Sequence, residues 1–483
     1  MKLLLVLTML FAANPAYVQE QQAEQQATDT ATVYLSLEDA IKIALSENVS
    51  VKVADKEIQR AKYAKRGTYA SLFPQIDGSA AFQRTIKKQV MYMDFDMSAL
   101  GGGAGAGAGA GTSAGTGTGS GTAAGGDTPK PKSGFEVGRW NTWNAGITAA
   151  MPIINAQLWQ SLRISADEVE LAVEKARGSR LAMVTSVKEA YYAALLAKAA
   201  YQVYEQAFKN AQDNLEVTQL RYNSQKASEM DLLRAKTTVA GAVPDLYNAL
   251  NNMELSLWQL KAVMGVDLEM NIDVKGSLAD HAQQLFYDLH ENDNADLTRN
   301  TTLRQLDIQV SELAKSVTLN KLAYVPSLAL SFNYTYSAMA NDFDFSTYQW
   351  TPYSFVGLSL QIPIFSGGKR YHAVKQSKVQ LEQVKLQQQQ TERELRIAVK
   401  SYLSTMESNM NSYYAAVSAV ESAEKGYEIS SESYKVGRST LIELNDALLA
   451  RAQSEMMQWQ SVYAFLVAKA GLEQQLGKDY IEE

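Results

Sequence analysis

The sequence predicts an α+β membrane protein built from two α-β-β-α repeats. Three observations support this fold class. The second half of the chain repeats the order of motifs in the first half. Four segments alternate apolar and polar residues, which is typical of strands with one apolar face. Two proline-free stretches are each long enough for a helix of roughly 100 Å. After the first residues, no apolar run reaches the roughly 20 residues that a membrane helix needs, so we expect strands to enter the membrane.

The composition argues against an enzyme. The chain has 483 residues, of which 46% are hydrophobic and 20% charged, with no Cys and only His281, His290 and His372. This excludes disulfides, Fe–S clusters and most structural zinc sites. The formal net charge of −7 disfavours a nucleic-acid partner. Because there is also no Walker motif and no credible catalytic triad, we expect no catalytic residue, no metal and no cofactor.

The first residues resemble a secretory signal. Lys2 precedes an apolar run from Leu3 to Ala13, and small or turn residues follow up to Ala16. We therefore predict a signal peptide over residues 1–16, although a buried N-terminal helix is an alternative. Residues 17–34 form a polar, Gln-rich segment.

The first repeat is predicted over residues 35–264. It aligns with the second repeat through the segments that begin at Ser50 and Thr302, but Pro74 and Pro152 lie 41 positions farther apart than Pro326 and Pro363. A segment of mainly Gly, Ala, Ser and Thr accounts for this insertion, and we expect it to be a disordered loop. The predicted elements are strands at about 75–94 and 138–152, the Gly-rich loop 101–126 and a long helix over 155–222.

A connecting, equatorial segment over 265–300 precedes the second repeat, which covers 301–476 and is followed by a tail over 477–483. Its predicted elements are strands at about 327–345 and 350–364 and a long helix over 369–435. In that helix a heptad repeat, with small residues on the companion seam, predicts supercoiled packing. The heptad residues are Val399, Met406, Tyr413, Val420, Tyr427 and Tyr434, and the companion seam includes Leu395, Tyr402, Ala416 and Ala423.

Four strands cannot close a barrel, because roughly eight are the usual minimum. An open sheet with bare edges is not stable in lipid, so a membrane role requires oligomerisation. Alternation alone leaves open a soluble sandwich sheet whose apolar face packs against a core. The lengths of the helices favour the membrane alternative, because globular domains rarely contain helices of this length.

The duplicated order of helices and strands, together with their lengths, resembles the TolC family of outer-membrane efflux proteins, also called outer membrane factors. The motifs are LSLEDAIKIALSENVSV over 35–51, IPIFSGGKR over 362–370 and VGRSTLIELNDALLA over 436–450. The resemblance implies a homotrimer with a 12-stranded outer-membrane β-barrel, continued by a long periplasmic α-helical coiled-coil barrel. It also implies a Gram-negative outer membrane, a periplasmic adaptor (membrane fusion protein) and an inner-membrane transporter as partners.

The resemblance also suggests functions for the turns between long and short helices. By spacing alone, Glu443 and Asp446 share one helical face, which is typical of a solvated surface. The resemblance implies instead that they form an acidic ring at the pore entrance. It further implies that Asp231 and Tyr434 belong to an interhelical lock at that entrance. The implied adaptor-docking tips contain Tyr222, Gln225, Gly437, Arg438 and Ser439, although these residues could equally be ordinary helix turns.

We therefore expect the outer-membrane channel of a tripartite efflux or type I secretion system, acting as a passive duct. The alternative is a trimeric coiled-coil surface protein with a membrane anchor. Such a fibre should concentrate its strands at the C-terminus, whereas the predicted strands are central and duplicated. A soluble periplasmic helical scaffold is a second alternative, and it would fractionate without detergent.

Overall fold

The structure is a computed structural model that describes residues 32–92, 134–282 and 296–480. The predicted signal peptide, the Gly-rich loop and residues 481–483 of the tail lie outside the described residues. The chain divides into two compact units. We call them the helical unit, with residues up to 68, 159–323 and from 365, and the strand unit, with residues 69–158 and 324–364. In the described part of the chain, no helix combines the length and apolarity that crossing a bilayer requires.

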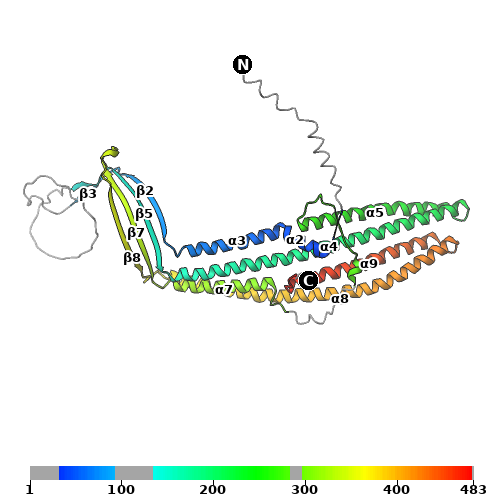
Figure 1. The fold of residues 1–483 in the computed structure, drawn as a ribbon. Coiled ribbons are helices and arrows are strands. Elements are labelled where there is room, and N and C mark those ends of the chain that lie inside the picture. Colours follow the sequence, from blue (N-terminus) through cyan, green and yellow to red (C-terminus); the bar gives the residue numbers. More distant parts are fainter. Residues whose placement is uncertain (1–31, 93–133, 283–295, 481–483) are drawn as a thin grey trace, which may run out of the picture. The chain divides into compact units, whose positions relative to one another are not determined.

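The strand unit is a four-stranded antiparallel sheet in the order β2-β5-β7-β8 (Figure 1). The strands of each repeat lie next to each other, and β5 pairs with β7 to join the two repeats. β2 and β8 are the edges of the sheet. The strands are β2 (Gln75–Arg84), β5 (Asn141–Ile154), β7 (Ser327–Ala340) and β8 (Thr351–Gln361).

The register places the predicted apolar residues on one face of the sheet. Directly opposed residues of an antiparallel pair point to the same side, and the pairing runs from Ile76 to Ala149, then to Phe332 and Val356. Many of these side chains are exposed in the single chain: Val356 is 70% exposed and Leu358 is 67% exposed. An apolar face of this size on an open sheet indicates a surface that is covered in the functional state.

The first predicted strand, 75–94, is wrong as a single element. The structure has β2 followed by a separate short strand, β3 (Gln89–Tyr92), which pairs with β4 (Gly134–Val137). Cations near the break interact with aromatic rings: Arg84 lies 5.2 Å from the ring centre of Phe343, and Lys88 lies 4.8 Å from that of Trp140. Each of these two charges therefore has an aromatic partner beside the strands.

The other strands end at turn residues and at Pro363. β7 ends at Ala340, five residues before the predicted end at 345. A 3₁₀ turn, η4 (Phe345–Thr347), follows it. β8 stops at Gln361, two residues before Pro363, which has no N–H for strand pairing. β5 begins at Asn141 and continues past Pro152 with a shift of register, which fits the usual confinement of strand prolines to irregular positions.

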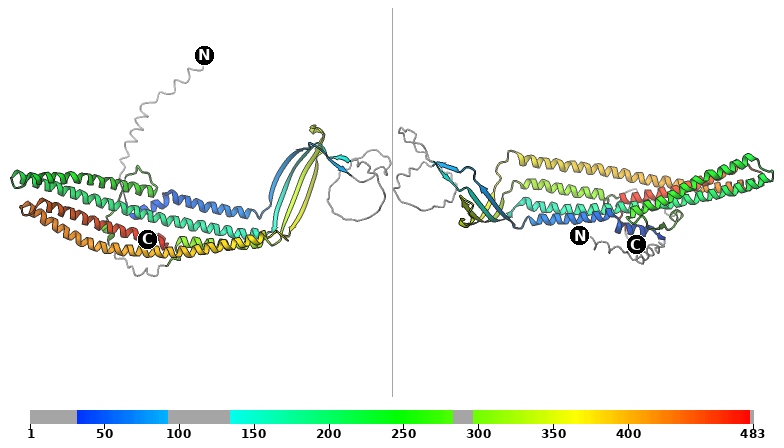
Figure 2. Two further views of the ribbon diagram at one scale, coloured as in Figure 1. Left: turned by 180° about the vertical axis from the view of Figure 1, so that it is seen from behind. Right: turned by 90° about the horizontal axis from the view of Figure 1, so that it is seen from above.

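The helical unit contains two very long helices with shorter helices along them (Figures 1 and 2). α7 and α9 pack along α8. Both figures show α3 and α5 running beside α4. The bounds are α2 (Leu37–Glu47), α3 (Val49–Ala70), α4 (Ala156–Asn223), α5 (Glu229–Met264), α6 (Leu278–His281), α7 (Thr301–Leu322), α8 (Lys369–Lys435) and α9 (Leu441–Gln475).

The heptad seam of α8 faces its neighbours. Val399, Met406 and Tyr434 are buried, and the other three heptad residues are half-buried. On the companion seam, the ring of Tyr402 packs against Gly471 of α9, so closely that an added Cβ would lie 2.6 Å from a ring carbon. A glycine therefore lets α8 and α9 approach each other.

We expect Gly471→Ala to destabilise the protein by about 1–3 kcal/mol, because the new methyl group would displace the Tyr402 ring. The control is Gly241→Ala in α5, where no atom lies within 4 Å of an added Cβ. The control should be neutral or stabilising by up to about 1 kcal/mol, because alanine is the better helix former. Thermal unfolding of the full-length protein in detergent, followed by circular dichroism, compares the two. Equal melting temperatures would contradict the close packing.

The helical stretch that precedes β2 is divided at Asn48. Asn48 has extended backbone angles, and its side-chain amide donates to the carbonyl of Val263 at the end of α5 over 2.7 Å. Its side-chain oxygen accepts the N–H of Ser50 over 2.7 Å, which begins α3. One buried asparagine therefore ends α2, begins α3 and binds the last turn of α5.

The middle of the helical unit contains its largest core. A short strand, β1 (Val33–Leu35), pairs in parallel with β6 (Ile272–Val274), and the hydroxyl of Tyr191 donates to backbone carbonyls beside both strands, at Leu35 and Lys275. The predicted boundary of the polar segment at residue 34 is therefore wrong, because Val33 and Tyr34 belong to a strand. The equatorial segment contributes β6 and α6 to the described structure.

Candidate functional site

The two helical hairpins end in turns with the same construction. In each hairpin, the long helix ends with a backbone hydrogen bond that spans six residues. The Lys226 N–H donates to the Arg221 carbonyl over 2.7 Å after α4, and the Arg438 N–H donates to the Ser433 carbonyl over 2.8 Å after α8. Gln225 and Gly437 are at the left-handed position of these turns, with φ of 58° and 81°. A non-glycine residue there costs roughly 1 kcal/mol, so Gln225 is a strained replacement for glycine.

The returning helices begin with matching capping boxes. Ser228 caps α5 and receives the N–H of Asp231 on its hydroxyl oxygen, whereas the Asp231 carboxylate accepts the Ser228 N–H over 3.2 Å. Thr440 caps α9 in the same way with Glu443, whose carboxylate accepts the Thr440 N–H over 3.1 Å. Two predicted site residues, Asp231 and Glu443, therefore start helices in addition to any role at an entrance.

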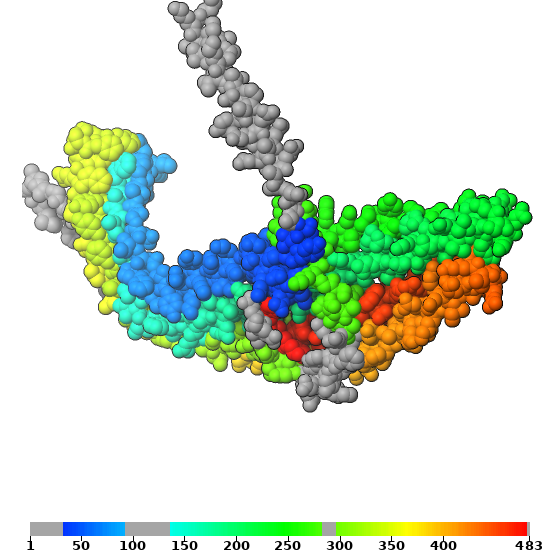
Figure 3. All heavy atoms as spheres, turned by 45° about the vertical axis from the view of Figure 1, so that its right-hand side comes forward, coloured from blue at the N-terminus to red at the C-terminus, as the bar shows by residue number. Residues whose placement is uncertain are grey.

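The ends of the two hairpins, coloured green and orange, lie beside each other in Figure 3. Tyr434 joins the two hairpins near these ends. It is 3% exposed, and its hydroxyl lies 2.9 Å from the hydroxyl of Thr218 on α4. The guanidinium of Arg221 lies 4.4 Å from the Tyr434 ring centre and donates to the Tyr434 carbonyl. We call Thr218, Arg221 and Tyr434 the tip clamp.

The tip clamp lies on a small apolar cluster that includes Leu441 and Leu444 of α9. Burial raises the pKa of the neighbouring Tyr427 hydroxyl above its ordinary value. A second contact joins the returning helices, because the amide of Asn445 donates to the hydroxyl of Thr238 on α5 over 3.2 Å. All four helices of the two hairpins are thus connected near their tips.

The structure does not bring the two predicted lock residues into direct contact. Among the described residues, Asp231 bonds to Ser228, whereas Tyr434 bonds to Thr218 and Arg221. Arg221 and Thr218 were missed by sequence reasoning. The heptad repeat placed Tyr434 on a seam, but no sequence signal identified its partners on the other long helix.

The predicted acidic pair is exposed at the start of α9. Glu443 and Asp446 lie on the exposed side of the helix, and Leu441, Leu444 and Leu448 form its buried side. The predicted docking tips are also largely accessible: Tyr222, Gln225, Gly437 and Arg438 are exposed and Ser439 is half-buried. Exposed apolar residues stand among them, including Val436, which is 68% exposed.

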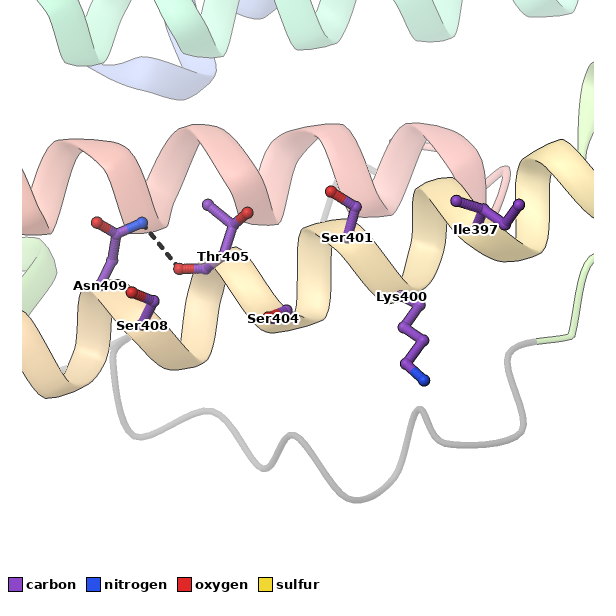
Figure 4. Close-up of a pocket in the computed structure, with 7 residues that line it drawn as sticks. All are labelled: Ile397, Lys400, Ser401, Ser404, Thr405, Ser408 and Asn409. Atoms are coloured by element: carbon purple, nitrogen blue, oxygen red, sulfur yellow. Dashed lines mark hydrogen bonds between the residues drawn. The ribbon is translucent and has the colours of Figure 1, made fainter.

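A shallow groove of about 520 Å³ lies farther along α8 (Figure 4). Its lining has hydroxyl and amide groups with one cation, and Figure 4 shows the Asn409 amide directed at the carbonyl of Thr405. The one titratable side chain in this lining is the exposed Lys400, and no carboxylate, imidazole or thiol accompanies it. We therefore assign the groove no chemistry. The lining residues are Ile397, Lys400, Ser401, Ser404, Thr405, Ser408 and Asn409.

A family model described as "Outer membrane efflux protein" matches residues 40–266 and 294–478, which is well over half of the chain. This chain belongs to the outer membrane efflux protein family. The resemblance to TolC proteins is therefore confirmed. The outer membrane protein TolC of Vibrio cholerae is 20% identical over 337 residues, covering 69% of this chain and 76% of that protein.

Solved structures with a similar fold are outer-membrane channels. The CmeC outer membrane channel of Campylobacter jejuni has a TM-score of 0.66 at 16% identity, covering 91% of this chain and 85% of CmeC. The open state of the MtrE outer membrane channel of Neisseria gonorrhoeae also has a TM-score of 0.66, at 15% identity, covering 91% of this chain and 88% of MtrE. The outer membrane efflux protein described here therefore has the fold of these channels.

Proposed function

We propose that this protein is the outer-membrane channel of a tripartite efflux or type I secretion system. It would be a passive duct that carries substrates from an inner-membrane pump and a periplasmic adaptor to the cell exterior. The observation that carries the proposal is the open sheet of the strand unit. Its apolar face is exposed, and among the described residues its edge strands β2 and β8 pair only inward. Such a sheet needs further strands before it can face lipid.

Three copies of the sheet would supply twelve strands, which exceeds the roughly eight that close a barrel. In the proposed homotrimer, β2 of one copy pairs with β8 of the next, and the apolar face contacts the lipid of a Gram-negative outer membrane. The long hairpins then form a coiled-coil barrel that continues the passage into the periplasm. Membership of the outer membrane efflux protein family supports this arrangement. We further propose that residues 1–16 act as the export signal.

The hairpin tips would form the periplasmic entrance. Three copies of Glu443 and Asp446 would place six carboxylates around it, which favours the passage of cations. Asp231 and Tyr434 would contribute to the lock that keeps the entrance narrow. We propose that an adaptor docks on the exposed residues of the two tips, namely Tyr222, Gln225, Gly437, Arg438 and Ser439.

Two measurements on the full-length protein test the proposal. Native mass spectrometry of protein extracted from outer membranes should give a trimer, and planar bilayers containing it should carry stepwise ionic currents. A surface fibre could be trimeric but would carry no current. A monodisperse monomer in mild detergent, or a trimer without current, would refute the duct.

A further inference from the structure

The ends of the helical unit nearest in sequence to the strands have an unusual charge distribution. Along the chain, α3 ends a few residues before β2, and α4 begins just after β5. In the second repeat, α7 ends a few residues before β7, and α8 begins a few residues after β8. These four helix ends lie next to one another (Figures 1 and 2), and the Gln160 amide of α4 donates to the Lys315 carbonyl of α7 over 3.2 Å. They therefore form one end of the helical unit.

All the Lys, Arg, Asp and Glu side chains in the terminal stretches of these helices are cations. The stretches 61–68, 159–166, 316–322 and 365–379 contain nine Lys and Arg residues and no Asp or Glu, although acidic residues outnumber basic ones in the whole chain, 52 to 45. α8 contributes Lys369, Arg370, Lys375 and Lys378.

The other three helices supply the remaining five cations, which are Lys62, Lys65, Arg66, Arg163 and Lys321. Seven of the nine are exposed, whereas Lys65 and Arg370 are half-buried. The next acid along α4, Asp167, is buried and neutralised by Lys315, with a shortest N–O distance of 2.5 Å.

Exposed aromatic rings are found at the same end. Tyr63 is 67% exposed, Trp159 58%, Phe365 87% and Tyr371 55%. Two of the cations stand beside these rings: Arg66 lies 5.6 Å from the ring centre of Tyr63, and Lys375 lies 5.7 Å from that of Tyr371. Exposed aromatic and basic side chains together are typical of a surface at the boundary between lipid headgroups and water.

We propose that these cations and rings, which we call the basic–aromatic collar, bind the anionic headgroups of phospholipids in the periplasmic leaflet. This inference rests on the proposed function, because that function places the adjoining strands in the membrane. Headgroup phosphates are favoured over an acidic protein partner because the collar is continuous along the chain with all four strands and combines charge with exposed rings. The lysine and arginine side chains would bind phosphate, and the rings would insert among the headgroups.

The test compares phosphatidylglycerol with phosphatidylcholine in mixed micelles containing the full-length trimer, with retained lipid counted by native mass spectrometry. At low salt, the wild-type protein should retain roughly ten times as much phosphatidylglycerol as phosphatidylcholine. This preference should fall as the salt concentration rises. The triple variant Lys62→Gln, Lys65→Gln, Arg66→Gln should lose most of this preference. The control Lys209→Gln, Lys236→Gln, Lys385→Gln removes three exposed cations elsewhere and should retain it.

A wild-type protein without preference would overturn the collar and leave an acidic protein as the better partner. A triple variant that keeps the preference, or a control that loses it, would also overturn the proposal. The same samples in phosphatidylcholine bilayers separate this result from the proposed function. If they conduct while the lipid preference is absent, the duct stands and the collar fails. If the wild-type protein carries no current, the duct itself fails.

Discussion

The double variant Glu443→Gln, Asp446→Asn should lose most of its preference for cations over anions in single-channel recordings. A carboxylate about 8 Å from a permeating ion contributes about 0.5 kcal/mol in water before screening. Six such groups, reduced to about a third by physiological salt, contribute about 1 kcal/mol. The same carboxylates repel an anion by an equal amount, so the difference between a cation and an anion is about 2 kcal/mol. This corresponds to a roughly 30-fold change in the permeability ratio. The difference between wild type and variant should nearly vanish at about 1 M salt, where charges are screened within roughly 3 Å.

Glutamine is the appropriate replacement at 443, because its side-chain oxygen can still accept the Thr440 N–H and preserve the start of α9. An alanine variant would mix the loss of charge with the loss of a helix cap. The matched control is Asp213→Asn, Glu216→Gln, which removes two exposed carboxylates with the same spacing from α4. If the control variant loses as much cation preference, the selectivity would arise from acidic residues along the long helices and not from Glu443 and Asp446 at the tips.

Arg221→Met should loosen the hairpin tips by about 2–3 kcal/mol. The substitution removes hydrogen bonds from a guanidinium to the carbonyls of Tyr434 and Lys226, and it removes the cation above the Tyr434 ring. Amide exchange at both turns should therefore accelerate by roughly 30-fold or more, because each 1.4 kcal/mol corresponds to tenfold. If the clamp narrows the entrance, single-channel conductance should rise as well.

Two further variants isolate the clamp. Tyr434→Phe removes only the hydroxyl that contacts Thr218, so it should cost about 1 kcal/mol and keep the Arg221 contacts. Arg180→Met makes the same chemical change on α4 at a surface ion pair with Asp55 and should leave exchange at the tips unchanged. Unchanged exchange in Arg221→Met would show that the two hairpins are joined without the clamp.

Elements with a long periodic pattern could be predicted from the sequence, whereas single contacts between distant segments could not. The heptad repeat identified the buried seam of α8, and period-two alternation identified the apolar face of the sheet. The break at Asn48 was missed because the amide that stabilises it donates to Val263, which is 215 residues away. Arg221 was missed for the same reason, since only the alignment of α4 with α8 brings it to Tyr434.

Unlike the contacts between distant segments, the two capping boxes could have been predicted from the sequence. Ser228 with Asp231 and Thr440 with Glu443 have the sequence signature of a helix start, three residues apart. The family resemblance implies a role at the entrance for the same residues. The structure shows that these carboxylates also begin α5 and α9, which is why charge-removing variants must preserve the cap.

Within the described part of the chain the two edge strands of the sheet have no outer partner, and this has a consequence for inheritance. In the proposed trimer each chain completes its neighbours, so a cell that expresses two alleles would build mixed channels. An allele with an intact sheet but a defective tip would enter these channels as readily as the normal one, and most channels would then contain a defective chain. Such an allele should be dominant, whereas an allele that deletes all four strands of the sheet should be recessive, because its product has no strand that could pair with a neighbour.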